Sequence, residues 1–330
     1  MKKNLIKKLN NNFKMSENQD KVYERLKNSK FKQQKLPGWR PVPTIASTTI
    51  IFICFGVIFI LLGTLILIFS NQIIEIKKRY DDLPDCKDSE ICNITIPIEQ
   101  DMERTIMIYY QLNGFYQNHR RYVKSKSDVQ LNGKTMTLEE MRRSQECDPV
   151  VTNEEMGFPE GKKSITGIPL NMNELAVPCG LIAKSFFNDE FIDWKVDGEN
   201  ITVNEKDISW SADRELKYKN TNDLSKQWIN ITDEHFIVWM RPAGLPNFRK
   251  LWGRIEDIDL KKGQIVTLTV LNRFDVNKFD GSKYLVLSTV NIFGGKNNFL
   301  GISYIVLGAI CIVLAVVFII GYNFHQKKEK

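Results

Sequence analysis

Two long stretches without Lys, Arg, Asp or Glu constrain this chain more than any other feature of its sequence. The first runs from residue 41 to residue 74, and the second runs from residue 297 to residue 326. A transmembrane helix needs about 20 apolar residues to cross about 30 Å of hydrocarbon. Neither stretch shows the polar stripe of a helix that faces water. We therefore expect transmembrane helices at residues 44–70 and 300–322 rather than buried core helices.

Charge at the two ends of the chain predicts its orientation in the membrane. The first apolar stretch is too long for the core of a cleaved signal peptide, and no small-x-small cleavage site follows it, so we expect a signal anchor. Residues 1–43 carry twelve Lys and Arg against three Asp and Glu, and such basic segments stay in the cytoplasm. We expect a cytoplasmic N-terminal tail at 1–43, an exoplasmic or lumenal ectodomain at 71–299, and a cytoplasmic C-terminal tail at 323–330.

The net charge of +7 is concentrated in the two tails, which hold +9 and +2. The remaining segment is therefore close to −4, so the basic composition does not indicate a nucleic-acid partner. Basic tails of this kind are attracted to the anionic lipids of the cytoplasmic leaflet. Membrane lipids are therefore candidate partners, and ordinary charges that set the topology are an interpretation of the tails that is at least as good.

Cysteine positions agree with this topology. Cys54 and Cys311 lie inside the apolar stretches and are expected to be free thiols. The other four lie in the ectodomain, where disulfides form; they are Cys86, Cys92, Cys147 and Cys179. Four cysteines allow three pairings, and the short separation of the first two favours Cys86–Cys92, which leaves Cys147–Cys179. No zinc-like spacing of Cys or His occurs, so we expect no metal.

Three Asn-x-Ser/Thr sequons fall in the predicted ectodomain, at Asn93, Asn200 and Asn230. The chain is so rich in Asn that about three sequons are expected by chance. Glycosylation is the expectation at each of these positions, and the sequons carry little independent weight for the topology.

The ectodomain has stronger strand signals than helix signals. Residues 265–271 and 284–293 are rich in β-branched and aromatic residues, and 236–240 is a short apolar run. Residues 137–144 and 247–251 are candidates for short helices. The sum predicts antiparallel sheets with long loops, that is, an all-β sandwich with small helical insertions between two transmembrane helices.

Patterns typical of catalysis are missing from the sequence. It holds three histidines and no zinc-protease, nucleophile-elbow or phosphate-loop motif. The one distinctive polar cluster is His119-Arg120-Arg121, in which the arginines could clamp carboxylates or phosphates. An internal network of salt bridges is the interpretation that we favour for it. We expect no enzyme activity and no cofactor.

Several segments resemble one known family, the phospholipid-flippase β-subunits, also called the cell cycle control protein 50 or ligand-effect modulator family. The resemblance extends from about residue 31 to the end of the second apolar stretch. The matching segments are Phe31–Trp39, Tyr109–Leu112, Phe115–Ser125, Pro178–Gly180, Ile182–Asp189, Trp239–Leu251 and Gly294–Tyr304.

The resemblance implies a fold and a role. The ectodomain would be an asymmetric β-sandwich that packs on the exoplasmic loops of the catalytic α-subunit of a type IV P-type ATPase, a phospholipid flippase. The chain would be its non-catalytic β-subunit, needed for exit from the endoplasmic reticulum and for the lipid-translocation cycle that supports membrane lipid asymmetry. Its location would be the endoplasmic reticulum, Golgi, endosome or plasma membrane. The alternative is a membrane-anchored receptor that binds a ligand or sugar without any ATPase.

Two details qualify the resemblance. Family members often have two nested disulfides near the start of the ectodomain, and here only Cys86 and Cys92 remain for them, whereas Cys147 and Cys179 fit the next family bridge. At the C-terminus, Lys327 and Lys328 have the spacing of a dilysine retrieval signal. A plain positive flank for the second span is an equally good interpretation of these lysines.

Overall fold

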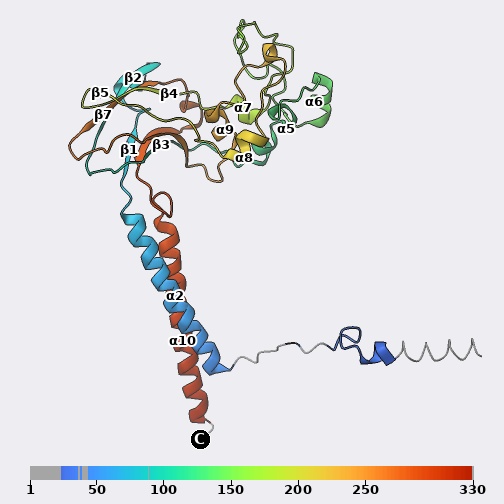
Figure 1. The fold of residues 1–330 in the computed structure, drawn as a ribbon, viewed down its shortest axis with the longest axis vertical. Coiled ribbons are helices and arrows are strands. Elements are labelled where there is room, and N and C mark those ends of the chain that lie inside the picture. The colour runs from blue at the N-terminus through green and yellow to red at the C-terminus, as the bar shows by residue number, and fades with distance from the viewer. Residues whose placement is uncertain (1–23, 36–37, 39–43, 88, 329–330) are drawn as a thin grey trace, which may run out of the picture. The chain divides into compact units, whose positions relative to one another are not determined.

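The computed structural model describes residues 24–35, 38, 44–87 and 89–328 and divides into two compact units. One unit comprises residues up to 59 together with 307–330, and the other comprises residues 60–306. Each unit contains part of the two long helices, and the second contains the whole β-rich domain (Figure 1). Most of the expected N-terminal tail, including Trp39, lies outside the described residues.

Both expected membrane spans are helices, α2 (Ile45–Asn71) and α10 (Asn298–Lys328). In their most apolar windows only 11% and 17% of the residues are buried inside the protein. The core helix of a soluble domain would instead be mostly buried, so these outward-facing apolar surfaces suit a bilayer. Helix α10 continues past the expected end of the span at Tyr322, because no Gly or Pro follows that residue to end it.

Glycines let the two long helices approach closely within each unit. In the first unit, a Cβ added to Gly56 would lie 2.6 Å from Cδ1 of Ile312. In the second unit, a Cβ added to Gly63 would lie 2.8 Å from the carbonyl oxygen of Gly301. Membrane helices commonly pack through small residues in this way.

Replacing Gly63 by isoleucine is therefore expected to weaken the packing of α2 against α10 and to lower the thermal stability of the protein in detergent micelles. Overpacking of this kind costs about 1–3 kcal/mol. Scanning fluorimetry would measure the change. The matched control is Gly321→Ile, at a position in α10 where an added Cβ meets nothing within 4 Å. Equal thermal stability of the two variants would contradict the prediction.

The β-rich domain contains two four-stranded sheets in which all neighbouring strands are antiparallel. The first sheet has the order β1 (Glu75–Arg79), β8 (Ser282–Ser288), β3 (Ile106–Asn113), β6 (Phe248–Ile255). The second has the order β2 (Ile91–Pro97), β7 (Ile265–Leu271), β4 (Glu190–Val196), β5 (Glu199–Asn200). Strand β2 alternates exposed and buried residues, and the buried faces of both sheets share one hydrophobic core. The predicted antiparallel sandwich is confirmed.

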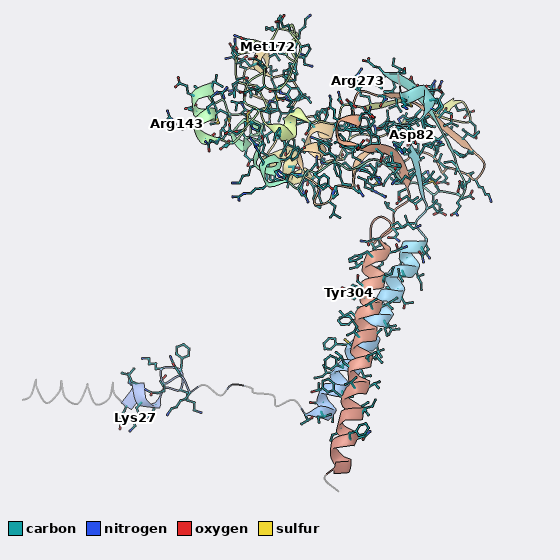
Figure 2. All side chains as sticks on the ribbon, turned by 180° about the vertical axis from the view of Figure 1, so that it is seen from behind. Lys27, Asp82, Arg143, Met172, Arg273 and Tyr304 are labelled. Atoms are coloured by element: carbon teal, nitrogen blue, oxygen red, sulfur yellow. A yellow bond between two sulfur atoms is a disulfide. The ribbon has the colours of Figure 1, made fainter. Side chains whose placement is uncertain are left out.

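Short helices interrupt the connections between strands. They are α3 (Pro84–Lys87), α4 (Arg120–Lys124), α5 (Asp128–Leu131), α6 (Leu138–Ser144), α7 (Leu181–Lys184), α8 (Ser211–Leu216) and α9 (Glu234–Met240), with 3₁₀ turns at Leu224–Lys226 and Asn277–Phe279. We call residues 114–188, between β3 and β4, the loop-rich lobe. Figure 2 shows Arg143 and Met172 in this lobe and Arg273 on the sandwich.

Two local predictions were wrong and one is confirmed. Residues 247–251 are not a helix, because from Phe248 onward they form β6 and pair with β3. Residues 236–240 are helical instead of extended, because Asp233 caps the start of α9 by accepting a hydrogen bond from the Phe236 N–H at 3.0 Å. The expected helix at 137–144 is α6, which begins at a capping box formed by Thr137 and Glu140.

Candidate functional site

Two disulfides fix the ends of loops in the β-rich domain. Cys86 is bonded to Cys92 with a Cα–Cα distance of 5.0 Å, and Cys147 is bonded to Cys179 with a Cα–Cα distance of 5.7 Å. Cys54 and Cys311 are free. The first bridge joins α3 to strand β2. The second joins the segment after α6 to the segment before α7, and so closes the loop-rich lobe.

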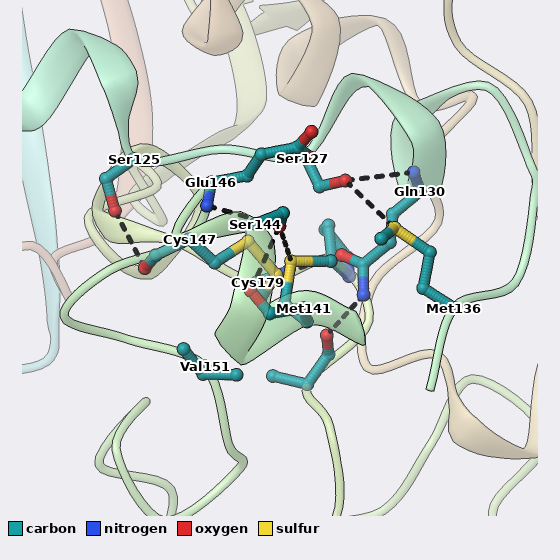
Figure 3. The surroundings of a disulfide bond; sticks show 12 residues. Ser125, Ser127, Gln130, Met136, Met141, Ser144, Glu146, Cys147, Val151 and Cys179 are labelled. Carbon is teal, nitrogen blue, oxygen red and sulfur yellow. Dashed lines mark hydrogen bonds between the residues drawn. A yellow bond between two sulfur atoms is a disulfide. The ribbon is translucent and has the colours of Figure 1, made fainter. Parts of the chain in front are cut away.

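Polar side chains hold the second disulfide in place (Figure 3). Gln130 accepts a hydrogen bond from the backbone N–H of Cys179 at 2.9 Å and donates one to the carbonyl of Ala176 at 3.1 Å. The Ser125 hydroxyl donates to the carbonyl of Cys147 at 3.0 Å. Because Gln130 and Ser125 are buried, these bonds are protected from water, and they make the lobe a fixed structure.

All three sequon asparagines are exposed. Asn93 lies on β2, Asn200 ends β5, and Asn230 lies in the loop before α9. Exposure makes each of them accessible for modification, and glycosylation at each stays a prediction. Lys327 and Lys328 lie in the last turn of α10, where their side chains are outside the described part, and the retrieval signal also stays a prediction.

The internal network that we expected for His119, Arg120 and Arg121 is not formed. All three residues are exposed at the start of α4, and within the described residues none of their side chains takes part in an ion pair or a hydrogen bond. Arg120 and Arg121 therefore project two positive charges into solvent, and both guanidinium groups are available to a carboxylate-bearing partner.

Three exposed large apolar side chains, which the sequence analysis did not single out, lie on segments that are linked to the region of this cluster by hydrogen bonds and by a contact between Arg241 and Trp210. They are Tyr116, Trp210 and Leu245, which are exposed by 63%, 67% and 70%. The loop that contains Leu245 is tied to the 116–118 segment, because Asn118 donates to the carbonyl of Gly244 at 2.9 Å. We call Tyr116, Arg120, Arg121, Trp210 and Leu245 together the Tyr–Trp–Arg surface. All of these residues except Trp210 lie in segments that resemble the family, and that was the available signal in the sequence.

A buried carboxylate organises the part of this surface around Trp210. The guanidinium of Arg241 lies 5.1 Å from the centre of the Trp210 ring. Asp213, of which only 2% of the side chain is exposed, accepts hydrogen bonds from Arg241 and from Lys217. The hydrogen bond from Arg241 is the main reason that the pKa of Asp213 is lowered. The ion pair with Asp213 therefore fixes the Arg241 guanidinium that contacts the Trp210 ring.

A second buried network joins the two sheets. Lys283 of β8 donates from Nζ to Asp189 at 2.7 Å, to the side chain of Asn272 at 2.5 Å and to the carbonyl of Phe274 at 2.6 Å. Asp189 also accepts from the Tyr80 hydroxyl at 2.7 Å and from two backbone N–H groups. Burial lowers the pKa of Lys283, and Asp189 opposes that shift. Every polar group of this ion pair is bonded, so its role is structural.

Lys250 is the other buried lysine of the domain. Its Nζ donates to three carbonyl oxygens at the end of α9, those of Val238, Trp239 and Arg241, at 2.6–2.9 Å. Burial lowers the pKa of Lys250 to about 7. Because the amine is fully engaged with the end of a helix, it acts as a cap and is not presented to a substrate. Within the described residues, no group of three or more His, Cys, Asp or Glu could hold a metal ion.

These features define a class: a membrane protein in which two apolar helices flank a disulfide-bonded β-sandwich that carries exposed aromatic and arginine side chains. The chain belongs to the LEM3 (ligand-effect modulator 3) / CDC50 family, whose model matches residues 66–328.

Relatives from plants and mammals support the same assignment. The chain is 38% identical to ALA-interacting subunit 3 of Arabidopsis thaliana over 91% of this chain and 86% of that protein. It is 36% identical to cell cycle control protein 50A of Bos taurus, over 89% and 88% of the two chains. It is 29% identical to cell cycle control protein 50B of Homo sapiens, over 92% and 95%.

Proposed function

We propose that this chain is the non-catalytic accessory subunit of a type IV P-type ATPase that flips phospholipids. The observation that carries the proposal is the family match over residues 66–328, which covers the end of α2, the whole sandwich and α10. Relatives of matching length are named for interaction with another protein. A role as a partner also agrees with the fully bonded buried lysines, neither of which is presented as a reactive group.

The proposed orientation places residues 71–299 on the exoplasmic or lumenal side and both termini in the cytoplasm. A bound ectodomain changes the populations of its partner's conformations only through contacts that differ between them. In this way the subunit supports folding of the ATPase, its exit from the endoplasmic reticulum and its transport cycle. Its consequence for the cell is lipid asymmetry between the two leaflets.

The Tyr–Trp–Arg surface is the proposed contact with the exoplasmic loops of the ATPase. Trp, Tyr and Arg are the residues most enriched among those that dominate binding energy at protein interfaces. Arg120 and Arg121 have no partner among the described residues, so acidic groups on the ATPase can pair with them without breaking an existing bond.

Reversing the two charges tests this function and its site together. Arg120→Glu/Arg121→Glu is expected to weaken the complex by about 2 kcal/mol, or roughly thirtyfold. The measurement is co-purification of the ATPase in mild detergent, followed by lipid flipping in reconstituted vesicles.

The matched control is Arg143→Glu/Lys163→Glu, which changes the charge equally at two exposed positions of the loop-rich lobe outside this surface. Co-purification that falls equally in both double variants would reject the site. A wild-type protein that reaches its membrane and co-purifies with no ATPase at all would reject the function, and would favour an independent receptor.

A further inference from the structure

A broad cleft of about 700 Å³ opens between the sandwich and the loop-rich lobe. Its walls come from the 158–162 loop, from the start of β4, from Trp252 on β6 and from the 228–235 segment. Its lining combines aromatic rings with a comparable number of charged and polar side chains. Clefts of this size that bring both kinds of group together are typical of ligand sites. Within the described residues, no part of this chain fills it.

Aromatic rings form two faces of the cleft. Phe158 and Trp228 lie with their ring centres 5.2 Å apart, and the ammonium of Lys162 lies 5.6 Å from the centre of the Phe158 ring. Deeper in the cleft, the rings of His235 and Trp252 are 4.0 Å apart. Flat apolar faces bordered by polar groups match the alternation of C–H faces and hydroxyl edges on a sugar ring.

Two ring nitrogens in this lining have no hydrogen-bond partner among the described residues. They are Nε1 of Trp252, a residue that is only 5% exposed, and Nδ1 of His235. The other nitrogen of His235, Nε2, is 2.9 Å from a carboxylate oxygen of Glu205. Buried polar atoms are rarely left without partners. A hydroxyl group can both donate and accept, so a polyhydroxylated ligand could satisfy both nitrogens.

Asn230, the asparagine of the third sequon, is itself a wall residue of this cleft. Its side-chain oxygen accepts from Asn220 at 2.8 Å, from the Thr232 N–H at 3.1 Å and from the Thr232 hydroxyl at 2.8 Å. Its Nδ2, the atom that N-glycosylation modifies, donates no hydrogen bond within the described part of the chain. Trp228, two residues earlier, lines the same cleft.

We propose that the N-linked glycan of Asn230 folds back into this cleft, with its first sugars against Trp228 and Phe158 and its hydroxyl groups toward Trp252 and His235. Attachment forms a bond between Nδ2 and C1 of the first sugar. The C1–O bond to a lipid-diphosphate donor breaks, and the amide loses one proton. The inference rests on the lumenal location proposed above. The docked glycan completes the wall between sandwich and lobe.

Release of the glycan by peptide:N-glycosidase F tests the inference on the full-length protein purified from eukaryotic cells. Site-specific mass spectrometry would follow each sequon over time in the folded and in the denatured protein. A glycan that is docked about nine-tenths of the time is released about tenfold more slowly, since only the undocked fraction is accessible. We expect that delay at Asn230 in the folded protein and its loss on denaturation. We expect no delay at Asn93, whose side chain is on the exposed face of β2.

Phe158→Ala removes one of the two rings in the Phe158–Trp228 pair. We expect this variant to release the Asn230 glycan faster, at the same rate as the Asn93 glycan. Trp228→Ala is the second variant, although it also removes a hydrogen bond from Nε1 to the carbonyl of Pro178 at 2.8 Å. The comparison of folded with denatured wild-type protein needs no variant, so the inference can still be tested if either variant fails to fold.

Three outcomes would overturn the inference. Asn230 could be unoccupied while Asn93 is glycosylated, or its glycan could be released as fast as that of Asn93. Protection that is present only when the ATPase is bound would mean that the partner covers the cleft. A chain with no glycan at any sequon would instead contradict the lumenal location, so failure of the proposed topology is distinguishable from failure of this inference.

Discussion

Lys283→Met is expected to destabilise the β-rich domain by about 3–5 kcal/mol, because it leaves the carboxylate of Asp189 buried without its counter-charge. The two side chains are exposed by only 2% and 0%. Lys283 also donates hydrogen bonds to the side chain of Asn272 and to the carbonyl of Phe274, and both acceptors would lose their donor. Thermal unfolding of the purified protein should shift downward by roughly 10 °C.

Two further variants distinguish the loss of stability caused by breaking this network from any general effect of removing a lysine. Lys278→Met removes a lysine whose side chain is 79% exposed and is expected to change stability by less than about 0.5 kcal/mol. Lys283→Met/Asp189→Asn removes both charges yet keeps a side-chain oxygen for the two backbone N–H groups, so it should recover part of the loss. A melting temperature for Lys283→Met equal to that for Lys278→Met would show that the ion pair does not hold the sheets together.

Gly180→Ala is the second substitution with a large expected effect. Gly180 has a φ of +103°, and a Cβ added there would lie 2.2 Å from the carbonyl oxygen of Ser125. That oxygen belongs to the backbone and cannot rotate away. A non-glycine residue in this conformation costs about 1–3 kcal/mol before any clash is counted. We expect the loop-rich lobe to lose its fixed packing and the Cys147–Cys179 disulfide to form incompletely.

Thiol labelling followed by non-reducing mass spectrometry would measure how completely the disulfide forms in Gly180→Ala. We expect labelled, unpaired Cys147 and Cys179 in this variant. Gly161→Ala is the matched control, because Gly161 also has a positive φ, of +82°, yet a Cβ there meets nothing within 4 Å. If the two alanine variants formed the disulfide equally well, contact with Ser125 would not be the constraint.

Local pattern in the sequence was enough to predict some elements of this fold. The membrane helices follow from long apolar runs, strand β7 follows from a run of β-branched residues, and α6 follows from a Thr–Glu capping box. Helix α9 was misread because an apolar run of five residues suits a strand and a buried helix equally well. Its N-cap, Asp233, was the deciding signal.

Contacts between distant parts of the chain could not be predicted in the same way. Lys283 and Asp189 are 94 residues apart, and nothing near either residue indicates its partner. The exposure of Arg120 and Arg121 depends on which carboxylates the fold brings near them, and among the described residues it brings none into bonding range. Sequence pattern therefore identified the segments that contain the candidate contact surface without showing which side chains face solvent.

The order of strands in the first sheet has a consequence for biosynthesis. Strand β1 follows the first membrane helix directly, and its hydrogen-bonded neighbour β8 directly precedes the second, so Glu75 pairs with Ser288 across nearly the whole ectodomain. During translation β1 remains without its neighbour until almost all of the chain has been made. The edges of β1 and β3 that β8 covers in the finished sheet stay open until that last strand arrives between them, and open strand edges of this kind are prone to pair with other chains.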